Sequence, residues 1–203
     1  MYAGVLESHG RAPPVHAMKK RPRKRAYPLD KIRRFLEPGP VVLVSSAHAG
    51  QRNIMTMGWH MMMGFEPALF ACYLWRGNHT YGLVRRSREC VINLPGSDLL
   101  DAVVGIGNCS GAEVDKFARF GLTAGPARKV GAPLIRECHA NFECRLYEQR
   151  QTAAYHLFIW EVVAAHVATS PRLPETVHYR GNGEFMISGR TVSRRRAFRP
   201  ENL

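Results

Sequence analysis

Apolar residues fall into short runs along this chain, and these runs predict β-strands. Residues 41–46, VVLVSS, form a β-branched run that is typical of a buried strand. In residues 140–150, Phe142, Cys144 and Leu146 alternate with other positions, as in a half-buried strand. Further strands are expected from Asn53 onward, at 68–74, at 90–94, at 155–167 and as two short extended pieces around 180–183.

Helical periodicity is limited to four short segments. Residues 27–37 predict a helix that Asp30 caps, and a second helix is expected to start at Thr80. Ser97 is the expected N-cap of a third helix, which glycines loosen into a loop from residue 105, and residues 115–120 form a last helical turn. Because strands dominate and hairpin-type turns join them, the pattern predicts a mainly-β fold, an antiparallel barrel with inserted helices, rather than a doubly wound parallel sheet.

One stretch, NIMTMGWHMMMGFEPALFACYLWRGNHTY at 53–81, is the strongest candidate for a binding site. Its two apolar halves are expected to be strands, and each half ends in polar residues that can meet one ligand. The chain contains no Walker A, GxGxxG, HExxH or GxSxG motif, so the common phosphate, dinucleotide, zinc-protease and esterase signatures are excluded.

Charge and composition narrow the functional classes that remain possible. The net charge of +13 is concentrated at 1–25 and 190–203, whereas the middle is nearly balanced. A nucleic-acid reader spreads basic residues over a folded face, so specific nucleic-acid binding is not expected. We predict a disordered basic tail at 1–25, one domain at 26–172 and a C-terminal extension at 173–203.

The five cysteines include no CxxC pair, which favours a reducing, cytoplasmic setting. Cys138, His139 and Cys144 lack a convincing fourth ligand, so no metal site is predicted. Polar and breaking residues interrupt the apolar run at 54–75, which excludes a spanning helix, and residues 1–26 lack the apolar segment of a signal peptide.

An ordered series of short segments adds a family resemblance. The segments are GPVVLVSS (39–46), NIMTMGW (53–59), NHT (78–80), CVINLP (90–95), SGAEVDKF (110–117), FGLT (120–123), VGAPLI (130–135), NFECRL (141–146) and YHLFIWEVVAAHV (155–167). Each is weak alone, but in this order they resemble the flavin reductase-like family of FMN-binding split β-barrel proteins. The resemblance implies an antiparallel split barrel of Greek-key type and a homodimer with FMN near the subunit interface. It also implies hydride transfer from NADH or NADPH to flavin, and onward to a small-molecule acceptor or a partner monooxygenase.

The same resemblance suggests the cofactor-binding residues. An isoalloxazine ring is flat and apolar with a polar rim, whereas its phosphate favours hydroxyls, cations and a helix N-terminus. The candidates for the ring are Asn53, Met55, Thr56, Met57, Gly58 and Trp59; those for the phosphate are Asn78, His79, Thr80 and Arg85; Ser110 and Gly111 lie in a second loop.

Several positions allow a plainer interpretation. Trp59 can be a core residue, Thr80 a helix cap, and Lys116 one half of a solvated pair with Asp115. His156 is a weak candidate for a catalytic acid, because many relatives have Gly-Asp-His where this chain has Ala-Tyr-His. The C-terminal extension is either a surface segment or one that crosses to the partner subunit.

Three other functions stay open from the sequence. One is a flavin binder without catalytic activity, and another is a split-barrel oxidase acting on a pyridoxal-type phosphate or a deazaflavin. The third is a nucleic-acid-associated protein that uses its basic ends.

Overall fold

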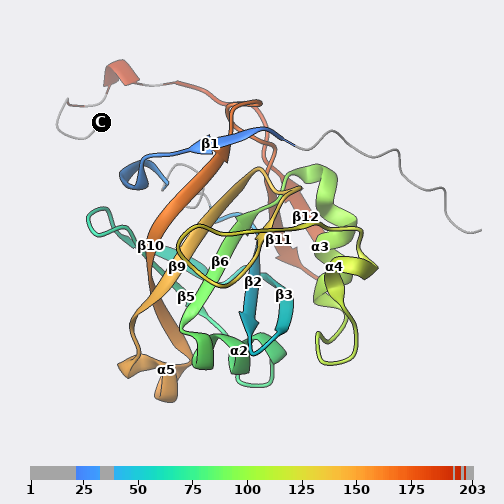
Figure 1. The fold of residues 1–203 in the computed structure, drawn as a ribbon. Helices are drawn as coiled ribbons and strands as arrows, with labels where there is room; N and C mark the ends of the chain where they lie inside the picture. Colours follow the sequence, from blue (N-terminus) through green and yellow to red (C-terminus); the bar gives the residue numbers. More distant parts are fainter. Residues whose placement is uncertain (1–21, 33–38, 194, 198, 200–203) are drawn as a thin grey trace, which may run out of the picture.

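An eight-stranded antiparallel sheet forms the body of the protein (Figure 1). The computed structural model describes residues 22–32, 39–193, 195–197 and 199. The sheet's strands are β1 (Lys24–Ala26), β2 (Val42–His48), β3 (Gln51–Met57), β4 (His60–Gly64), β5 (Leu69–Tyr73), β6 (Glu89–Leu94), β9 (Ala140–Glu148) and β10 (Leu157–Ala168). Two small hairpins add β7 (Ala124–Gly125) with β8 (Leu134–Ile135), and β11 (Val177–Gly181) with β12 (Glu184–Ile187).

The order of the strands closes the sheet on itself. Neighbours follow the order β3-β2-β6-β9-β10-β5-β4, with β1 paired to β10. Only Gly58 and Trp59 separate β3 from β4, which lie at opposite ends of that order. Because two residues span only about 7 Å, the two ends must lie close together. The predicted mainly-β split barrel is therefore confirmed.

The helices are short and sit between strands. They are α2 (His79–Ser87), α3 (Leu100–Gly107), α4 (Lys116–Arg119) and α5 (Arg150–Tyr155), with 3-10 turns η1 (Leu29–Lys31), η2 (Ser97–Leu99) and η3 (Arg195–Ala197). In α2, Leu83 and Val84 are buried and Arg85 is exposed, as its sequence pattern predicts.

Two apolar clusters hold the barrel together. One fills its interior, with Phe70, Phe142 and Trp160 among its fully buried side chains, and the other lies under α3 and α4. Strand β2 contributes Val42 and Val44 to the first cluster and Leu43 to the second. This double burial explains why VVLV is continuously apolar rather than alternating.

Several local predictions were wrong. Of the helix expected at 27–37, the structure describes only η1, and residues 33–38 lie outside the described part. Ser97 is not an N-cap, because its hydroxyl donates to Glu175 at 2.9 Å and no side chain caps η2. Strand 140–150 ends at Glu148, and the unforeseen helix α5 follows it.

The N-terminal boundary of the folded part also differs from the prediction. Strand β1 begins at Lys24, inside the segment predicted to be a tail, while residues 1–21 lie outside the described part.

Helix α3 continues through Gly105, where a loop was expected. The ring of Phe120 approaches Gly105 so closely that a Cβ there would lie 2.3 Å from it. This packing outweighs the low helix propensity of glycine.

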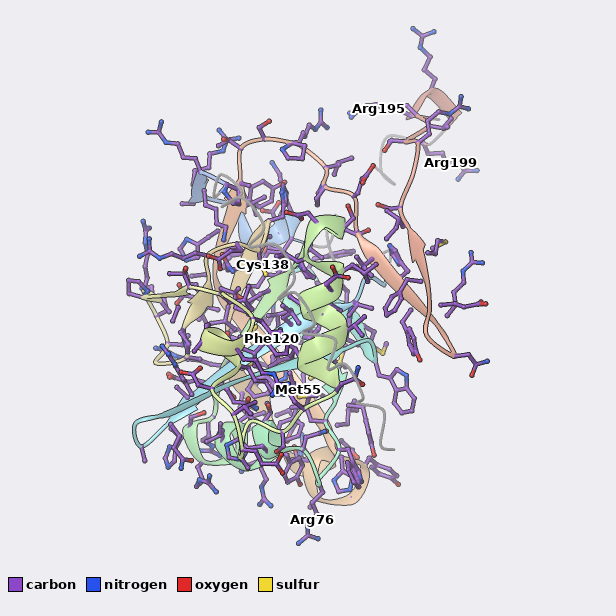
Figure 2. All side chains as sticks on the ribbon, turned by 90° about the vertical axis from the view of Figure 1, so that its right-hand side faces the viewer. Met55, Arg76, Phe120, Cys138, Arg195 and Arg199 are labelled. Atoms are coloured by element: carbon purple, nitrogen blue, oxygen red, sulfur yellow. The ribbon has the colours of Figure 1, made fainter. Side chains whose placement is uncertain are left out.

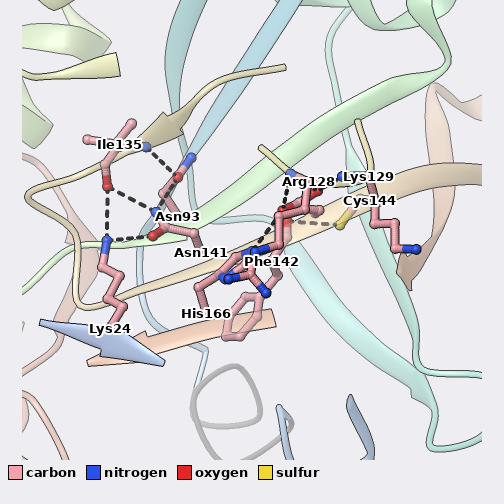
Figure 3. Close-up of polar contacts among 10 residues, drawn as sticks. Lys24, Asn93, Arg128, Lys129, Ile135, Asn141, Phe142, Cys144 and His166 are labelled. Atoms are coloured by element: carbon pink, nitrogen blue, oxygen red, sulfur yellow. Dashed lines mark hydrogen bonds and ion pairs between the residues drawn. The ribbon is translucent and has the colours of Figure 1, made fainter. Parts of the chain in front are cut away.

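Buried polar side chains tie the loop at 126–136 to the barrel (Figure 3). The carboxylate of Glu143 is fully buried and accepts the backbone N–H groups of Arg128 at 2.9 Å and Lys129 at 2.6 Å, besides meeting His166 Nε2 at 2.7 Å. Burial alone raises the pKa of Glu143, but these hydrogen bonds outweigh it and hold the pKa below its usual value.

A second group of buried polar side chains surrounds Asn141, which lies on strand β9 like Glu143. Asn141 Nδ2 donates to Asn93 Oδ1 at 2.6 Å and to the carbonyl of Ile135 at 3.0 Å. Lys24 Nζ donates to Asn141 and to the Arg136 carbonyl at 3.1 Å, and burial lowers the pKa of Lys24 to about 8. Strand β1 is thereby fixed to the barrel by a side chain as well as by its backbone.

Replacing Glu143 with glutamine tests the role of the buried carboxylate. Glu143→Gln leaves a backbone N–H group without its acceptor, so we expect a loss of about 1–3 kcal/mol in the free energy of unfolding at neutral pH. Because the folded-state pKa is lowered, the wild-type advantage is present above the usual glutamate pKa of about 4.3 and disappears as the pH falls through the lowered value.

Urea denaturation of both proteins at several pH values measures this difference. Glu184→Gln, at an exposed position of β12, is the matched control and should change the free energy little. A Glu143→Gln protein as stable as the control at neutral pH would contradict the assignment.

Candidate functional site

The main candidate site is a hollow of about 690 Å³ at one end of the barrel. Strand β3, the N-terminus of α2, the C-terminal end of α3 and the loop before α4 surround it. A volume of this size suits a cofactor or a small substrate. The lining includes eight of the twelve predicted cofactor residues: Asn53, Met55, Thr56, Asn78, His79, Thr80, Ser110 and Gly111. We call this hollow the cofactor pocket.

Asn53 carries an unused acceptor in this pocket. Its side chain is buried, and Nδ2 donates to Thr80 Oγ1 at 2.8 Å, which fixes the amide plane. Oδ1 has no hydrogen-bond partner among the described residues. A buried acceptor without a partner is costly, so this atom is suited to receive a donor from a ligand.

Gly111 allows its loop to approach Asn53. A Cβ at this position would lie 1.9 Å from Asn53 Oδ1, a distance that no side chain tolerates. Any residue larger than glycine would therefore displace either the amide or the loop. The pairing of a free acceptor with an obligatory glycine makes this the most constrained part of the pocket.

The first turn of α2 faces the same pocket. Asn78 is the N-cap residue, yet its side chain makes no capping hydrogen bond. The first N–H groups of a helix have no partners within the helix, and together with the helix dipole they attract anions. His79 and Thr80 carry two of these N–H groups and line the pocket. This end of the pocket is therefore suited to a phosphate.

Lys116 brings positive charge into the pocket. The interpretation of Lys116 as half of a solvated pair with Asp115 was wrong. Its side chain is buried, and Nζ donates to the carbonyl of Ile106 at 2.9 Å. Burial lowers the pKa of Lys116, while the nearby Cys109 acts in the opposite sense. Asp115 instead caps α4 through the N–H of Phe117 and pairs with Arg52 at 2.9 Å. Lys116 is therefore not half of a solvated pair with Asp115.

Four predicted cofactor residues lie outside this pocket. Met57 is buried in the barrel core, beyond the part of β3 that lines the pocket. Arg85 is exposed and its guanidinium stands 5.8 Å from the centre of the Tyr81 ring. Gly58 and Trp59 line a second hollow of about 580 Å³ on the other side of Thr56.

His156 is also separate from the pocket lining. It caps α5 in a left-handed conformation, with φ of 55°, and stacks edge-on with Tyr81 at 5.6 Å between ring centres. Its Nδ1 is buried without a hydrogen-bond partner among the described residues. The geometry gives it a structural position between α5 and β10 and does not bring it to the ligand.

Sequence reasoning missed part of the pocket wall. The missed lining residues are Gly77, Ile106, Gly107, Asn108, Cys109, Glu113, Lys116 and Arg119. Most belong to the end of α3 and the loop after it, which were expected to form one loose segment. The family resemblance included the DKF segment, but Lys116 was interpreted as half of a solvated pair with Asp115.

The described residues contain neither a candidate metal site nor a membrane-spanning helix. Within the described ranges, no cluster of three or more His, Cys, Asp or Glu side chains could hold a metal ion. Among the helices that the structure describes, none has the length and apolar character needed to cross a membrane.

Comparisons with known proteins agree with this fold. The model of the flavin reductase like domain matches residues 33–184. A protein of Archaeoglobus fulgidus is 33% identical over 111 residues, which cover 55% of this chain and 63% of that protein. YddH of Escherichia coli K12 is 31% identical over 174 residues, covering 79% of this chain and 92% of that protein.

A solved structure gives the same result in three dimensions. An FMN-binding domain of a flavin reductases-like enzyme from Shewanella baltica superposes with a TM-score of 0.79 at 26% identity, covering 86% of this chain and 98% of that one. The match in sequence over most of the chain, together with the closed barrel, shows that this protein belongs to the flavin reductase like domain family.

Proposed function

We propose that this protein is an FMN-dependent oxidoreductase that takes hydride from NADH or NADPH and delivers electrons to an acceptor. The observation that carries this proposal is the contact between Asn53 and Gly111. The buried acceptor Asn53 Oδ1 has no partner among the described residues, and the loop beside it can approach only because residue 111 is glycine. Membership of the family and the FMN-binding relative from Shewanella baltica support the choice of cofactor.

The residues present fit FMN at both of its ends. Asn53 Oδ1 can accept a hydrogen bond from the cofactor, and Met55 and Thr56 line the same wall with flexible and small side chains. The uncapped start of α2 suits the phosphate, and Lys116 and Arg119 supply positive charge in the lining. Glu113 is the acidic residue of the lining, so the charge there is not uniform.

The division of labour between cofactor and protein follows from this fit. When bound, FMN supplies the hydride chemistry, and the protein supplies binding and orientation. Asn53, held by Thr80, would bind the cofactor through its free acceptor, and the N–H groups of α2 would bind the phosphate. No side chain is assigned as a general acid, and the candidate role of His156 is not retained, because its ring packs against Tyr81 outside the pocket lining.

We further propose that two copies of the chain form a homodimer through strand β4. Met61, Met63 and Phe65 are 59%, 47% and 64% exposed, although all three are large and apolar. Strand β4 also ends the strand order of the barrel, so one of its backbone edges lacks a neighbouring strand in the described chain. Exposed apolar side chains concentrated on a sheet edge are typical of an interface.

The Gly111→Ala variant tests the cofactor site. The added methyl group collides with Asn53 Oδ1, so we expect the affinity for FMN to fall by about tenfold or more, measured by fluorescence titration. Gly189→Ala is the matched control, because a Cβ there meets nothing within 4 Å and its backbone is not strained. Equal FMN affinity in the two variants would contradict the proposed site.

The proposed reaction is tested separately with the FMN-loaded protein under anaerobic conditions. NADH or NADPH should bleach the visible absorption of the bound flavin, and added acceptor should restore it. If neither nucleotide bleaches a protein that binds FMN tightly, the protein is a flavin binder and the oxidoreductase proposal fails.

The homodimer is tested by Met61→Glu. A charge on each copy of the exposed β4 face should shift the protein toward monomer in sedimentation experiments, because a buried unpaired carboxylate is costly. Tyr147→Glu, at a large side chain that is 55% exposed on β9, serves as the control. A wild-type protein that is monomeric at micromolar concentration would refute this interface.

A further inference from the structure

A third hollow, of about 280 Å³, lies beside strand β1. Strand β1, the β7–β8 hairpin, β9 and β10 surround it, and it shares no lining residue with the two hollows described above. Its lining residues are Pro22, Lys24, Gly125, Pro126, Leu134, Arg136, Asn141 and His166. We call this hollow the β1 pocket.

Positive charge in the β1 pocket is not balanced by its own lining. Lys24, Arg136 and His166 are basic, and no described residue of the lining is acidic. Two neighbouring carboxylates have partners of their own, because Glu143 meets His166 Nε2 at 2.7 Å and Glu137 accepts a backbone N–H group at 2.9 Å. The surplus charge therefore comes from Lys24 and Arg136, and it favours an anion in the hollow.

The ammonium group of Lys24 is fixed by acceptors of the protein (Figure 3). Nζ donates to Asn141 Oδ1 and to two backbone carbonyls, at 3.1 Å and 3.3 Å. Burial lowers the pKa of Lys24 to about 8, and the charge of Arg136 acts in the same direction, whereas Cys138 and Glu137 oppose it. At pH 7 the group is still mostly protonated. Lys24 therefore gives the pocket a fixed positive charge rather than a free donor.

Arg136 supplies the free donors of the β1 pocket. Among the described residues, its guanidinium group has no hydrogen-bond or ion-pair partner. Its side chain lies across Gly125, where a Cβ would stand 3.0 Å from Arg136 Cγ and 3.1 Å from Nε. Glycine at position 125 thus leaves room for this placement of the arginine. A planar guanidinium group can donate two parallel hydrogen bonds to one oxyanion.

We propose that the β1 pocket binds a phosphate group, either as inorganic phosphate or as the phosphate of a small metabolite. Arg136 donates to the phosphate oxygens, and Lys24 adds positive charge. Because a phosphate monoester carries a charge of about −1.5 to −2 at pH 7, it matches two cations better than a carboxylate does. The volume suits such a ligand, since it is less than half that of the cofactor pocket.

The bound phosphate would connect two parts of the chain that lie far apart in sequence. Lys24 belongs to β1, and Arg136 directly follows β8. A ligand between them therefore holds the N-terminal strand against the β7–β8 hairpin. This inference is independent of the proposed function, because the two sites have no lining residue in common.

Calorimetric titration of the full-length protein tests the proposal. Saturating FMN is present, because the cofactor pocket also suits a phosphate. Inorganic phosphate, glycerol 3-phosphate and acetate are titrated at equal ionic strength. We expect the two phosphates to bind with a Kd of about 1 mM or tighter, and acetate at least about tenfold more weakly. Absence of phosphate binding, or equal affinity for acetate, would overturn the proposal.

The two phosphate probes distinguish the two sources of the ligand. Tighter binding of glycerol 3-phosphate supports a metabolite ester, whose body would contact Pro126 and Leu134 of the lining. Equal affinity of the two probes supports inorganic phosphate, because the ester body then adds no contact.

The Arg136→Gln variant locates the binding. It removes the charge and the paired donors of an exposed side chain, so we expect phosphate affinity to fall by about tenfold and FMN affinity to stay unchanged. Arg76→Gln is the matched control, because Arg76 is exposed and lines none of the three hollows. Figure 2 shows Arg76 at the lower end of the molecule, well apart from Cys138, whose thiol neighbours Lys24. Equal phosphate affinity in the two variants would refute the assignment.

The outcomes keep this inference separate from the proposed function. A protein that takes up no FMN contradicts the proposed function but leaves the β1 pocket open to test. In that case Arg136→Gln is compared with Arg119→Gln, which alters the cofactor pocket. Phosphate affinity lost in Arg136→Gln supports the β1 pocket, and affinity lost only in Arg119→Gln overturns it.

Discussion

The short link between β3 and β4 is the constraint on which the rest of the structure depends. Gly58 and Trp59 join strands from opposite ends of the sheet order, so these two ends meet at the link although β3 and β4 are not hydrogen-bonded neighbours. Strand β3 is held along its whole length by β2, and in this position Asn53 reaches both Thr80 and the loop at Gly111.

The barrel could be predicted from the sequence because its strands carry their own pattern. Residues 41–46 and 90–94 are apolar because both faces of their strands are covered, and the rule that links apolar runs to buried strands needs no tertiary information. The ends of elements were harder to predict. Gly105 was read as a helix breaker, yet Phe120, which packs against its backbone, makes glycine the residue that the helix requires there.

The site followed the same division. The structure brings Asn53, Thr80 and Gly111, which the family resemblance suggested, together in one pocket. The structure places Met57 in the barrel core and Arg85 on the exposed side of α2, both outside the pocket lining. Met57 shares its face of β3 with Asn53 and Met55, and where the pocket ends along that face depends on packing that sequence distance does not encode. Lys116 could be judged only after burial showed that it points into the pocket.

The attachment of the C-terminal hairpin has a consequence for how this family can diversify. The hairpin follows the last barrel strand and is fastened by backbone hydrogen bonds at Val41 and Ser97, by the Ser97 hydroxyl on Glu175 and by the buried Val177 side chain, and Tyr179 and Phe185 take part in none of these contacts. Substitutions at Tyr179 or Phe185 therefore leave the barrel and the cofactor pocket untouched. Substitutions in the β11–β12 hairpin can therefore change which molecules bind beside it while the barrel continues to fold in the same way.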